Sequence, residues 1–509
     1  MRATFKYSIG IMTILLAVLG TDCRRGKIGE KHPNKPPETK LVNVPPENDS
    51  LHSYTKGDSL RVYLPLQTLS WDGDDEDGFV VKYRYRYRTV HVTRGDTYYF
   101  PARDAWIETT ATQVEIPFES SDADRIVDGD TIASNLQIFE VAAIDNEGAV
   151  DPTPAVKRFW TFANKLPETY ILYPADGDSL LVRANITPTW RGVLVSWCGE
   201  DPDGEVRDYR WRVDSLEWSP WTKDTFVYIN PVAFREPLDG WHIVEVMARD
   251  NLYNQDTTPA KIHVRLVEVK FDRPLLVVYE EQSAQPGGEP SNTEDFYIPL
   301  FDSVVGVGNY DVINFRTYMG SFIDTVAHYR VIFWYRDRTG INEEYWFWTA
   351  RNGEIKSIIS QYLDVGGNFW ISGWSAVFGR IEEAEFDSGG FGFDYMHIEE
   401  VEKISEPQFI GGEGHEGCPT VMVDTSRLPG VPRRWDGVRY VYGLTGRAFT
   451  LPLLTYVPRS DTTLVGKVVC TYYDGVTYKV VTTTFPLLYL YEEDARELVR
   501  YVLTKMNVL

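Results

Sequence analysis

The clearest pattern of hydrophobic and polar positions lies between residues 353 and 375. Apolar residues recur there at spacings of three and four, as on one buried face of a helix. These residues are Ile355, Ile358, Ile359, Tyr362 and Leu363. The glycines at 366–367 are expected to end the helix, because glycine readily adopts the left-handed conformation found at helix ends. The unbroken apolar run at 369–371 then predicts a strand buried on both faces, followed by a tight turn at Gly373.

Similar patterns extend this alternation of strands and helices over the C-terminal half of the chain. Strands are predicted at 275–279, 310–315, 331–337 and 480–485, and helices at 295–306 and 492–506, with an irregular stretch before the last strand. Strands that alternate with helices favour a parallel sheet covered on both faces. We therefore predict that residues 270–509 form an α/β domain with a mainly parallel sheet.

The middle of the chain contains an internal repeat of strands with period-two alternation. Both copies begin with a Glu-Thr pair, reach a tryptophan (Trp71 or Trp197) followed by an acidic Asp-Gly turn, and close on a V-x-A-x-D ending. Alternating strands between Asp-Gly and Pro turns predict an antiparallel β-sandwich for each copy, at 38–165 and 166–269. The first copy is longer in its middle, where an extended hairpin is expected. The predicted fold class is therefore multidomain, with two antiparallel β-sandwiches followed by an α/β domain.

Composition changes this picture mainly by excluding partners. The 509 residues are 43% hydrophobic and 14% aromatic, as expected of folded domains rather than of a disordered chain. A net charge of −23 argues against nucleic acid as a partner. The four cysteines are widely spaced and form no metal-binding motif, so neither a metal nor a cofactor is predicted. Buried free thiols are the expected state of the later three, with one disulfide as the alternative.

The first residues have the features of an export signal. Basic residues precede an apolar stretch at 9–19, which is too short to span a bilayer comfortably. Cys23 follows directly, where a bacterial lipoprotein carries its lipid, although the residues before it depart from the usual motif. We predict a signal peptide at 1–23 with lipidation of Cys23, cleavage without lipid being the alternative, and a tether at 24–37.

Two features of the repeat suggest binding sites. Acidic turns carry carboxylates at 72–77 and 200–203 that could ligate calcium, but their spacing does not match an EF-hand loop. The alternative is a solvated turn in which Gly78 or Gly204 adopts a positive φ. The arginines that alternate with aromatic residues after each turn could bind anions, or could face water on a strand buried on its other side.

The tryptophan, the Asp-Gly turn and the V-x-A-x-D-x-x-G ending resemble fibronectin type III and related immunoglobulin-like domains of bacterial surface proteins, over residues 38–268. The order of elements from 272 to 509, with DVGGNFWISG as its best local signal, is similar to the class I glutamine amidotransferase-like, flavodoxin-like fold. The first resemblance implies a fold and no activity.

The second resemblance implies a domain that lacks the catalytic triad. In catalytic members of that family, a cysteine nucleophile occupies the sharp turn after the strand, and a His-Pro-Glu motif follows the late strand. Here the turn at 371–375 reads ISGWS without a cysteine, and Phe485-Pro486-Leu487 stands where the motif would be. A thiolate needs a base to activate it and an acid to orient that base, and the sequence offers neither at these positions.

Other catalytic groupings are weaker. Ser372 or Ser375 would be a nucleophile without the G-x-S-x-G elbow. The glycine-rich loop at 412–418 combines His415, Glu416 and Cys418, but at spacings that define neither a triad nor a zinc site. His397 and Glu399 could share a metal as neighbours on a strand, although a structural histidine is the simpler interpretation.

The predicted parallel sheet suggests one place for a ligand. In open parallel sheets, ligands bind beyond the carboxyl ends of the strands. Polar side chains and a tryptophan that is expected to be exposed follow three predicted strands: Glu280, Glu281, Arg336, Asp337, Ser372, Trp374 and Ser375. We predict that they bind a polar ligand such as a sugar or a peptide, the alternative being that Arg336 and Asp337 form only a surface ion pair.

Together these patterns predict an exported, lipid-anchored protein of the bacterial cell envelope. In this interpretation, two β-sandwich spacers carry a non-catalytic α/β domain that binds or assembles, with an envelope protein or a glycan as its partner. The membrane is expected to be contacted through the N-terminal lipid. The alternatives are a secreted hydrolase that acts on polysaccharide or peptide, and a structural component of an envelope complex.

Overall fold

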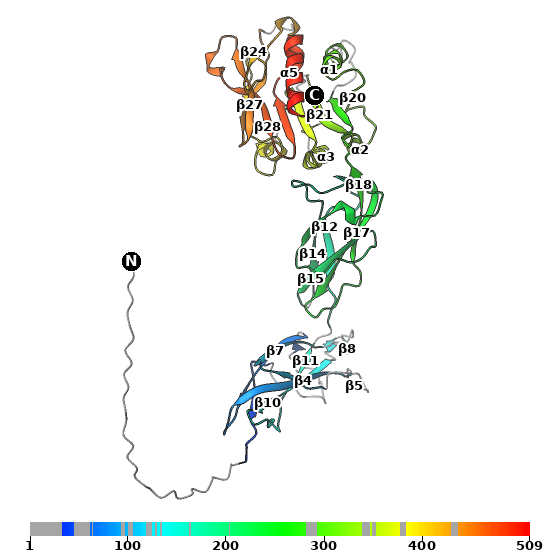
Figure 1. The fold of residues 1–509 in the computed structure, drawn as a ribbon, viewed down its shortest axis with the longest axis vertical. Coiled ribbons are helices and arrows are strands. Elements are labelled where there is room, and N and C mark those ends of the chain that lie inside the picture. The colour runs from blue at the N-terminus through cyan, green and yellow to red at the C-terminus, as the bar shows by residue number, and fades with distance from the viewer. Residues whose placement is uncertain are drawn as a thin grey trace, which may run out of the picture. The chain divides into compact units, whose positions relative to one another are not determined.

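The chain forms two compact units, Met1–Asn164 and Lys165–Leu509 (Figure 1). A computed structural model describes residues 33–44, 62–63, 65–92, 97–99, 105–118, 125–127, 130–132, 135–161, 164–202, 204–280, 293–337, 347–348, 353–376, 383–428 and 436–509. The predicted signal peptide, Cys23 and the first part of the predicted tether lie outside these ranges.

The first unit is a β-sandwich. Its smaller sheet contains β1 (Glu38–Val42), β3 (Leu66–Asp74) and β7 (Gln113–Pro117) in that order. Its larger sheet has the order β2 (Val62–Tyr63), β11 (Ala155–Thr161), β10 (Asn135–Asp145), β4 (Val80–Val92) and β5 (Thr97–Tyr99). Strand β6 (Ile107–Thr109) also pairs with β4, and β8 (Arg125–Val127) and β9 (Asp130–Ile132) form a separate hairpin. The smaller and the larger sheet together enclose Trp71, Phe139 and Phe159. The β4–β5 hairpin lies where the longer first copy was expected to extend.

The second sandwich begins the second unit, and its seven strands correspond to seven of the first, with no described counterpart of β5, β6, β8 or β9. Its sheets are β12 (Glu168–Tyr173), β14 (Val193–Glu200) and β16 (Phe226–Ile229), and β13 (Ser179–Val182), β18 (Ala260–Glu268), β17 (Gly240–Asp250) and β15 (Val206–Val213), with a short 3-10 helix η1 (Pro231–Ala233). The predicted β-sandwiches are therefore confirmed. Each copy also contains one parallel pairing, of β2 with β11 and of β13 with β18, at the edge of its larger sheet.

Hydrogen bonds explain why each copy begins with Glu-Thr and ends with an Asp and a Thr-Pro-Ala. The Thr39 hydroxyl accepts a hydrogen bond from the Ala143 N–H at 2.8 Å, while the Thr39 N–H donates to Asp151 at 2.8 Å. Thr169 makes the same backbone contact, and its hydroxyl donates to Asp256 at 2.7 Å. These repeated residues tie the first strand of each sandwich to its last segments, so their role is structural.

The C-terminal part of the second unit is built on one mixed sheet. The strands follow the order β20 (Tyr310–Asn314), β19 (Arg273–Tyr279), β21 (Tyr329–Arg336), β22 (Asn368–Gly373), β29 (Lys479–Thr483), β28 (Val468–Asp474), β27 (Thr450–Pro458), β24 (Phe409–Gly414) and β25 (Val421–Met422). Among the described residues, β20 to β29 pair in parallel and β29 to β25 pair antiparallel. The expected mainly parallel sheet is thus mixed, because the stretch thought to be irregular supplies β24, β25, β27 and β28.

Helices and a small second sheet cover this mixed sheet. The helices are α1 (Ile298–Val304), after a π-helical turn η2 (Thr293–Tyr297), α2 (Phe322–Val326), α3 (Gly353–Asp364), α4 (Phe391–Asp394) and α5 (Glu492–Lys505). The small sheet pairs β23 (Ile398–Ile404) with β26 (Val441–Gly446), and the 3-10 helices are η4 (Trp374–Ala376), η5 (Glu383–Phe386), η6 (Thr425–Arg427), η7 (Thr462–Leu464) and η8 (Leu487–Tyr489). Along β21, Phe333 packs on the face with α1 and α5, and Trp334 on the face with α2 and α3, as period-two alternation requires.

The helix predicted around residue 359 is confirmed as α3, and all five of its predicted apolar residues are buried. Gly366 has a φ of +98°, and its N–H donates to the Leu363 carbonyl at 2.9 Å. The Gly367 N–H donates to the Tyr362 carbonyl at 2.8 Å. This pair of hydrogen bonds is the Schellman motif, which satisfies the last carbonyls of the helix.

The second sandwich packs against the α2 and α3 face, and the two share one hydrophobic core. Arg265 of β18 forms a bidentate ion pair with Asp324 of α2, at 2.6 and 3.0 Å. The Leu181 N–H of β13 donates to the Gln361 side chain at 3.0 Å, and the Arg183 guanidinium donates to the Val365 carbonyl at 2.7 Å. These contacts join the sandwich to α2 and to the end of α3.

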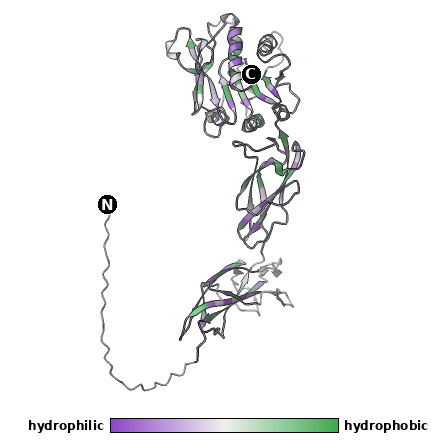
Figure 2. Cartoon of the chain, in the orientation of Figure 1, coloured by the Kyte–Doolittle hydropathy of each residue, from purple (hydrophilic) through white to green (hydrophobic). Residues whose placement is uncertain are grey.

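Hydrophobic and hydrophilic residues are interspersed along the strands of each unit (Figure 2). This distribution fits sheets that have one face in the core and the other toward water. Among the described residues, none of the helices has the length and hydropathy needed to cross a lipid bilayer.

Candidate functional site

Three of the residues predicted to bind a ligand meet at the carboxyl ends of β19 and β21, but they are buried. Glu280, Arg336 and Asp337 are 2%, 0% and 3% exposed. Glu280 accepts a hydrogen bond from the Trp334 indole at 2.7 Å and lies 3.6 Å from the Arg336 guanidinium. The Tyr297 hydroxyl donates to Asp337 at 2.7 Å.

These contacts of the buried charge cluster are all with other residues of the same domain. The pKa of Tyr297 lies well above its usual value, because burial and the nearby Asp337 carboxylate both disfavour the phenolate. Removing one partner of a buried ion pair leaves an uncompensated charge and is strongly destabilising. The expected surface pair of Arg336 and Asp337 is therefore not found, since both side chains lie inside the domain.

Of the remaining predicted ligand residues, Ser372 lies near the end of β22 and Trp374 begins η4. The Ser372 hydroxyl donates to the Phe485 carbonyl at 3.4 Å, and the Trp374 indole donates to the Arg439 carbonyl at 3.0 Å. The expectation of an exposed Trp374 is wrong, because only 1% of it is accessible. Glu281 and the side chain of Ser375 lie outside the described residues. Ligand binding by this group stays a prediction.

The turn after β22 has no room for a side chain. Gly373 has a φ of +83°, and a Cβ atom built there would lie 2.3 Å from the Arg336 carbonyl oxygen. Glycine alone tolerates both this conformation and this close approach. The predicted tight turn is confirmed, and it excludes a nucleophile at this position.

The histidines and the cysteine singled out as catalytic candidates are engaged elsewhere. The His397 ring stacks on Tyr473 with centroids 3.5 Å apart, and burial together with the Arg447 charge lowers the pKa of His397 to about 4. The His415 imidazole lies 2.8 Å from the Thr455 hydroxyl. Burial raises the pKa of the Cys418 thiol well above its usual value. Among the described residues, no group of His, Cys, Asp or Glu side chains is arranged to hold a metal ion.

The acidic turns of the two sandwiches require glycine for a reason other than the expected one. Neither Gly78 nor Gly204 has a positive φ. A Cβ atom at Gly78 would instead lie 2.3 Å from the Asn146 side-chain oxygen, and one at Gly204 would lie 2.6 Å from the Asp201 carboxylate. The glycines therefore admit polar side chains that close the turn.

The arginine faces of the sandwiches are covered by aromatic rings. Arg210 lies over Trp218 and Trp221, with centroid distances of 4.9 and 4.7 Å. In the first copy, Arg84 and Arg86 both lie 4.6 Å from the Trp106 ring. These cation–π contacts stabilise each larger sheet from outside. They explain the alternation of arginine and aromatic residues without an anionic ligand.

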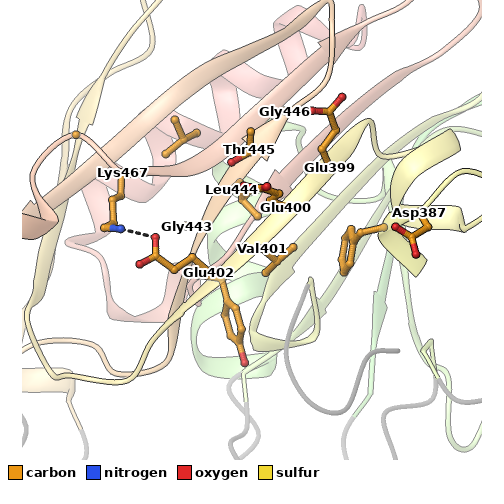
Figure 3. Close-up of a pocket in the computed structure, with 14 residues that line it drawn as sticks. Asp387, Glu399, Glu400, Val401, Glu402, Gly443, Leu444, Thr445, Gly446 and Lys467 are labelled. Carbon is orange, nitrogen blue, oxygen red and sulfur yellow. Dashed lines mark hydrogen bonds and ion pairs between the residues drawn. The ribbon is translucent and has the colours of Figure 1, made fainter. Parts of the chain in front are cut away.

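A first hollow, of about 820 Å³, lies along the small β23–β26 sheet (Figure 3). Val401, Tyr442 and Leu444 contribute apolar lining, and acidic side chains surround them: Asp387, Glu399, Glu400 and Glu402. Figure 3 shows Lys467 pointing toward Glu402, with which it forms an ion pair. The hollow presents negative charge and apolar surface, but its lining includes no histidine, cysteine or serine.

A second pocket, of about 360 Å³, lies where the second sandwich meets the end of α3. Tyr173, Leu194 and Tyr228 from the sandwich and Gln361 and Asp364 from α3 are among its lining residues. Burial raises the pKa of Asp364 to about 6, although a 3.2 Å hydrogen bond from the Tyr395 hydroxyl opposes this shift. Reasoning from the sequence missed this pocket, because its walls come from segments more than 100 residues apart.

Comparisons with known proteins give no assignment of family or function. No protein-family model and no curated protein matches the chain. Among solved structures, the fibronectin(III)-like modules of Clostridium thermocellum CbhA are 13% identical, with coverage of 45% of this chain and 95% of that one and a TM-score of 0.20. The four N-terminal Ig domains of Dscam1 isoform 6.44 are 12% identical, covering 42% and 53%, with a TM-score of 0.17.

A third similar structure is a Ca²⁺-stabilised adhesin that helps an Antarctic bacterium bind ice. It is 12% identical, with coverage of 46% of this chain and 50% of the adhesin and a TM-score of 0.17. Scores of this size carry no conclusion about what the chain does. The β-sandwich assignment rests on the strand pairing of the chain itself.

Proposed function

We propose that this chain is a non-catalytic binding or assembly protein of the bacterial envelope. In this proposal the chain is exported and anchored by a lipid on Cys23, and its two β-sandwiches carry a C-terminal α/β domain of the amidotransferase-like type. The observation that carries the proposal is the turn at Gly373, where neither the backbone conformation nor the space admits a nucleophilic side chain.

The surroundings of this turn support the proposal. The hydrogen bond from Ser372 to the Phe485 carbonyl brings the turn next to the segment that would supply a base in the amidotransferase-like family. Phe485 and Leu487 are fully buried there, and neither side chain can accept or donate a proton. The two segments thus lie side by side without the groups that amide hydrolysis would need.

The cysteines of the C-terminal domain support it as well. Cys418 and Cys470 belong to the hydrophobic core that also contains the buried face of α5. Burial raises the pKa of Cys470 to about 12, so its thiol stays protonated at neutral pH. Because the thiolate is the nucleophilic form of cysteine, neither thiol is in the form that attacks a carbonyl.

A hydrolysis assay tests the absence of amidotransferase chemistry. Purified chain incubated with glutamine, and separately with a chromogenic amide, is expected to release no more product than buffer does. Treatment with iodoacetamide and the Cys418→Ala variant should leave this background unchanged. Hydrolysis that disappears on alkylation would contradict the proposal.

The anchor is tested separately by the mass of the mature N-terminus. A cysteine at the first position that carries a diacylglyceryl group and an N-acyl chain is expected, because stable anchoring needs more than one acyl chain. An unmodified first residue other than Cys23 would overturn lipidation without affecting the non-catalytic assignment.

A further inference from the structure

The outer face of the β12–β14–β16 sheet carries exposed apolar side chains. Leu172 is 62% exposed, Phe226 53% and Tyr228 40%. Across β14 and β16, the outward pairs are Leu194 with Tyr228 and Ser196 with Phe226. Water therefore meets aromatic surface on this sheet of the second sandwich.

The first sandwich shows that the fold does not require this surface. At the same register of β3 and β7, the outward pairs are Thr68 with Glu115 and Ser70 with Gln113. The inward positions keep their character, since Trp71 and Trp197 are both buried. The exposed aromatic residues are thus a property of the second copy, and scattered exposure does not explain a set that shares one face.

This aromatic face continues into the pocket beside α3. Tyr173, Leu194 and Tyr228 lie on the sheet and also line the 360 Å³ pocket. Gln361 and Asp364 of α3 form its opposite side. The face and the pocket share Tyr173, Leu194 and Tyr228, and we refer to the pocket together with the adjoining aromatic face as the junction groove.

The polar groups of the junction groove favour a neutral ligand. Arg191 lies over the Tyr228 ring, 5.6 Å from its centroid, and Asp364 supplies one carboxylate on the other side. The two charges have opposite sign, so the lining gives no net preference for an anion or a cation. Gln361 and Thr477 add uncharged hydrogen-bonding groups. A few polar groups among aromatic walls, at a boundary between domains, are typical of a binding site for a small or extended ligand.

A peptide fits this groove less well. Extended peptides often bind by adding a strand to a free sheet edge. At the edge of β13 that faces the pocket, the Leu181 N–H is bonded to Gln361, and the neighbouring Val365 carbonyl accepts from Arg183. A ligand that relies on ring stacking and hydroxyl groups needs neither of these backbone atoms.

We propose that the junction groove binds a neutral polysaccharide chain. The aliphatic faces of the sugar rings would pack on Tyr173 and Tyr228, and their hydroxyl groups would bond to Arg191, Gln361 and Asp364 in the pocket. The chain would continue over Phe226 along the sheet. This inference rests on the proposed function, because it names the class of partner that the binding protein holds.

Calorimetric titration of the full chain tests this proposal. The probes are cellohexaose, xylohexaose, mannohexaose and chitohexaose, each added separately. At least one is expected to bind, and Tyr173→Ala and Tyr228→Ala should each weaken that binding about tenfold or more, as loss of a central aromatic anchor does. Glu115→Ala is the matched control, because Glu115 occupies the position of Tyr228 in the first sandwich, and it should leave the affinity unchanged.

Three results would overturn the proposal. If none of the four oligosaccharides binds, the assignment to a neutral glycan is wrong. Binding that is insensitive to both tyrosine variants would place the site elsewhere. Binding of an extended peptide that is lost in Tyr228→Ala would assign the groove to a protein partner. Unchanged melting temperatures of the variants exclude misfolding, and none of these results depends on the hydrolysis assay that tests the proposed function.

Discussion

The two β-sandwiches of this chain share one fold but differ in the side chains that they expose to solvent. Their inward residues correspond in register, from the buried tryptophan to the Thr–Asp hydrogen bonds that tie the first strand to the last. On the outer face of the smaller sheet, Thr68 and Glu115 of the first copy correspond to Leu194 and Tyr228 of the second.

This difference separates the residues that maintain the fold from those available for function. A side chain that faces the core is constrained by close packing, whereas a side chain on the outer face changes stability little when it changes. In the second copy, apolar side chains occupy outer positions next to α3. This copy also shares a hydrophobic core with the domain that contains α3. The comparison therefore separates the core positions, which are alike in both copies, from the outer positions, where we propose a binding role for the second copy only.

The largest expected effect comes from the buried tryptophans. Trp71→Ala and Trp197→Ala should each cost about 3–5 kcal/mol, because they remove packed surface and leave a cavity. Calorimetry is expected to show that Trp71→Ala lowers only the transition of the first unit. Trp197→Ala should lower the transition of Lys165–Leu509 as a whole, since that core extends into the C-terminal domain. A separate transition for the second sandwich would contradict the prediction that it unfolds together with the C-terminal domain.

A smaller effect is expected from the threonine at the start of each copy. Thr39→Val leaves the Ala143 N–H without its acceptor, whereas Thr169→Val also removes the donor to buried Asp256. Each should cost about 1–3 kcal/mol in chemical denaturation, with Thr169→Val the more destabilising. Thr→Ser in either copy keeps the hydroxyl and is the control. Equal losses in the two copies would mean that the extra hydrogen bond contributes nothing.

The smallest expected effect is a response to acid. At the register where the first copy has Arg88, the second has Asp214. Burial alone would raise the pKa of this carboxyl, but hydrogen bonds from the Arg235 N–H, His242 and the Ile243 N–H lower it below the ordinary aspartate value of about 3.9. The stability it supplies is therefore complete above that value and is lost as the pH falls through the lower folded-state pKa.

Melting curves between pH 5 and pH 2.5 measure this contribution of Asp214. Asp214→Asn should lower the stability of the second unit at pH 5 and reduce its further loss on acidification. The transition of the first unit should be the same in both proteins. If the wild type and the variant lose stability in parallel as the pH falls, Asp214 has the same pKa in the folded and unfolded states, and the prediction is wrong.

Local patterns were sufficient for the elements that are self-contained in the sequence. Helix α3, its end at Gly366 and the buried strand β22 were all predicted, because helical spacing, a positive φ and an unbroken apolar run are each encoded within a few residues. The repeat was likewise visible, since a core tryptophan and its turn recur in each copy. Strands β24 to β28 were missed, because strand formation depends on packing against partner strands, such as β27 for β24, that lie elsewhere in the chain.

The sequence by itself determined the two sandwiches, the central helix and strand, and the turn at Gly373. Only the tertiary structure decided where polar residues lie. Glu280, Arg336 and Trp374 follow strands as a ligand site would require, yet neighbouring elements bury them. The junction groove exists only where the second sandwich meets α3. Burial and adjacency depend on packing between segments far apart in the chain, and this packing leaves no periodic trace in any one of them.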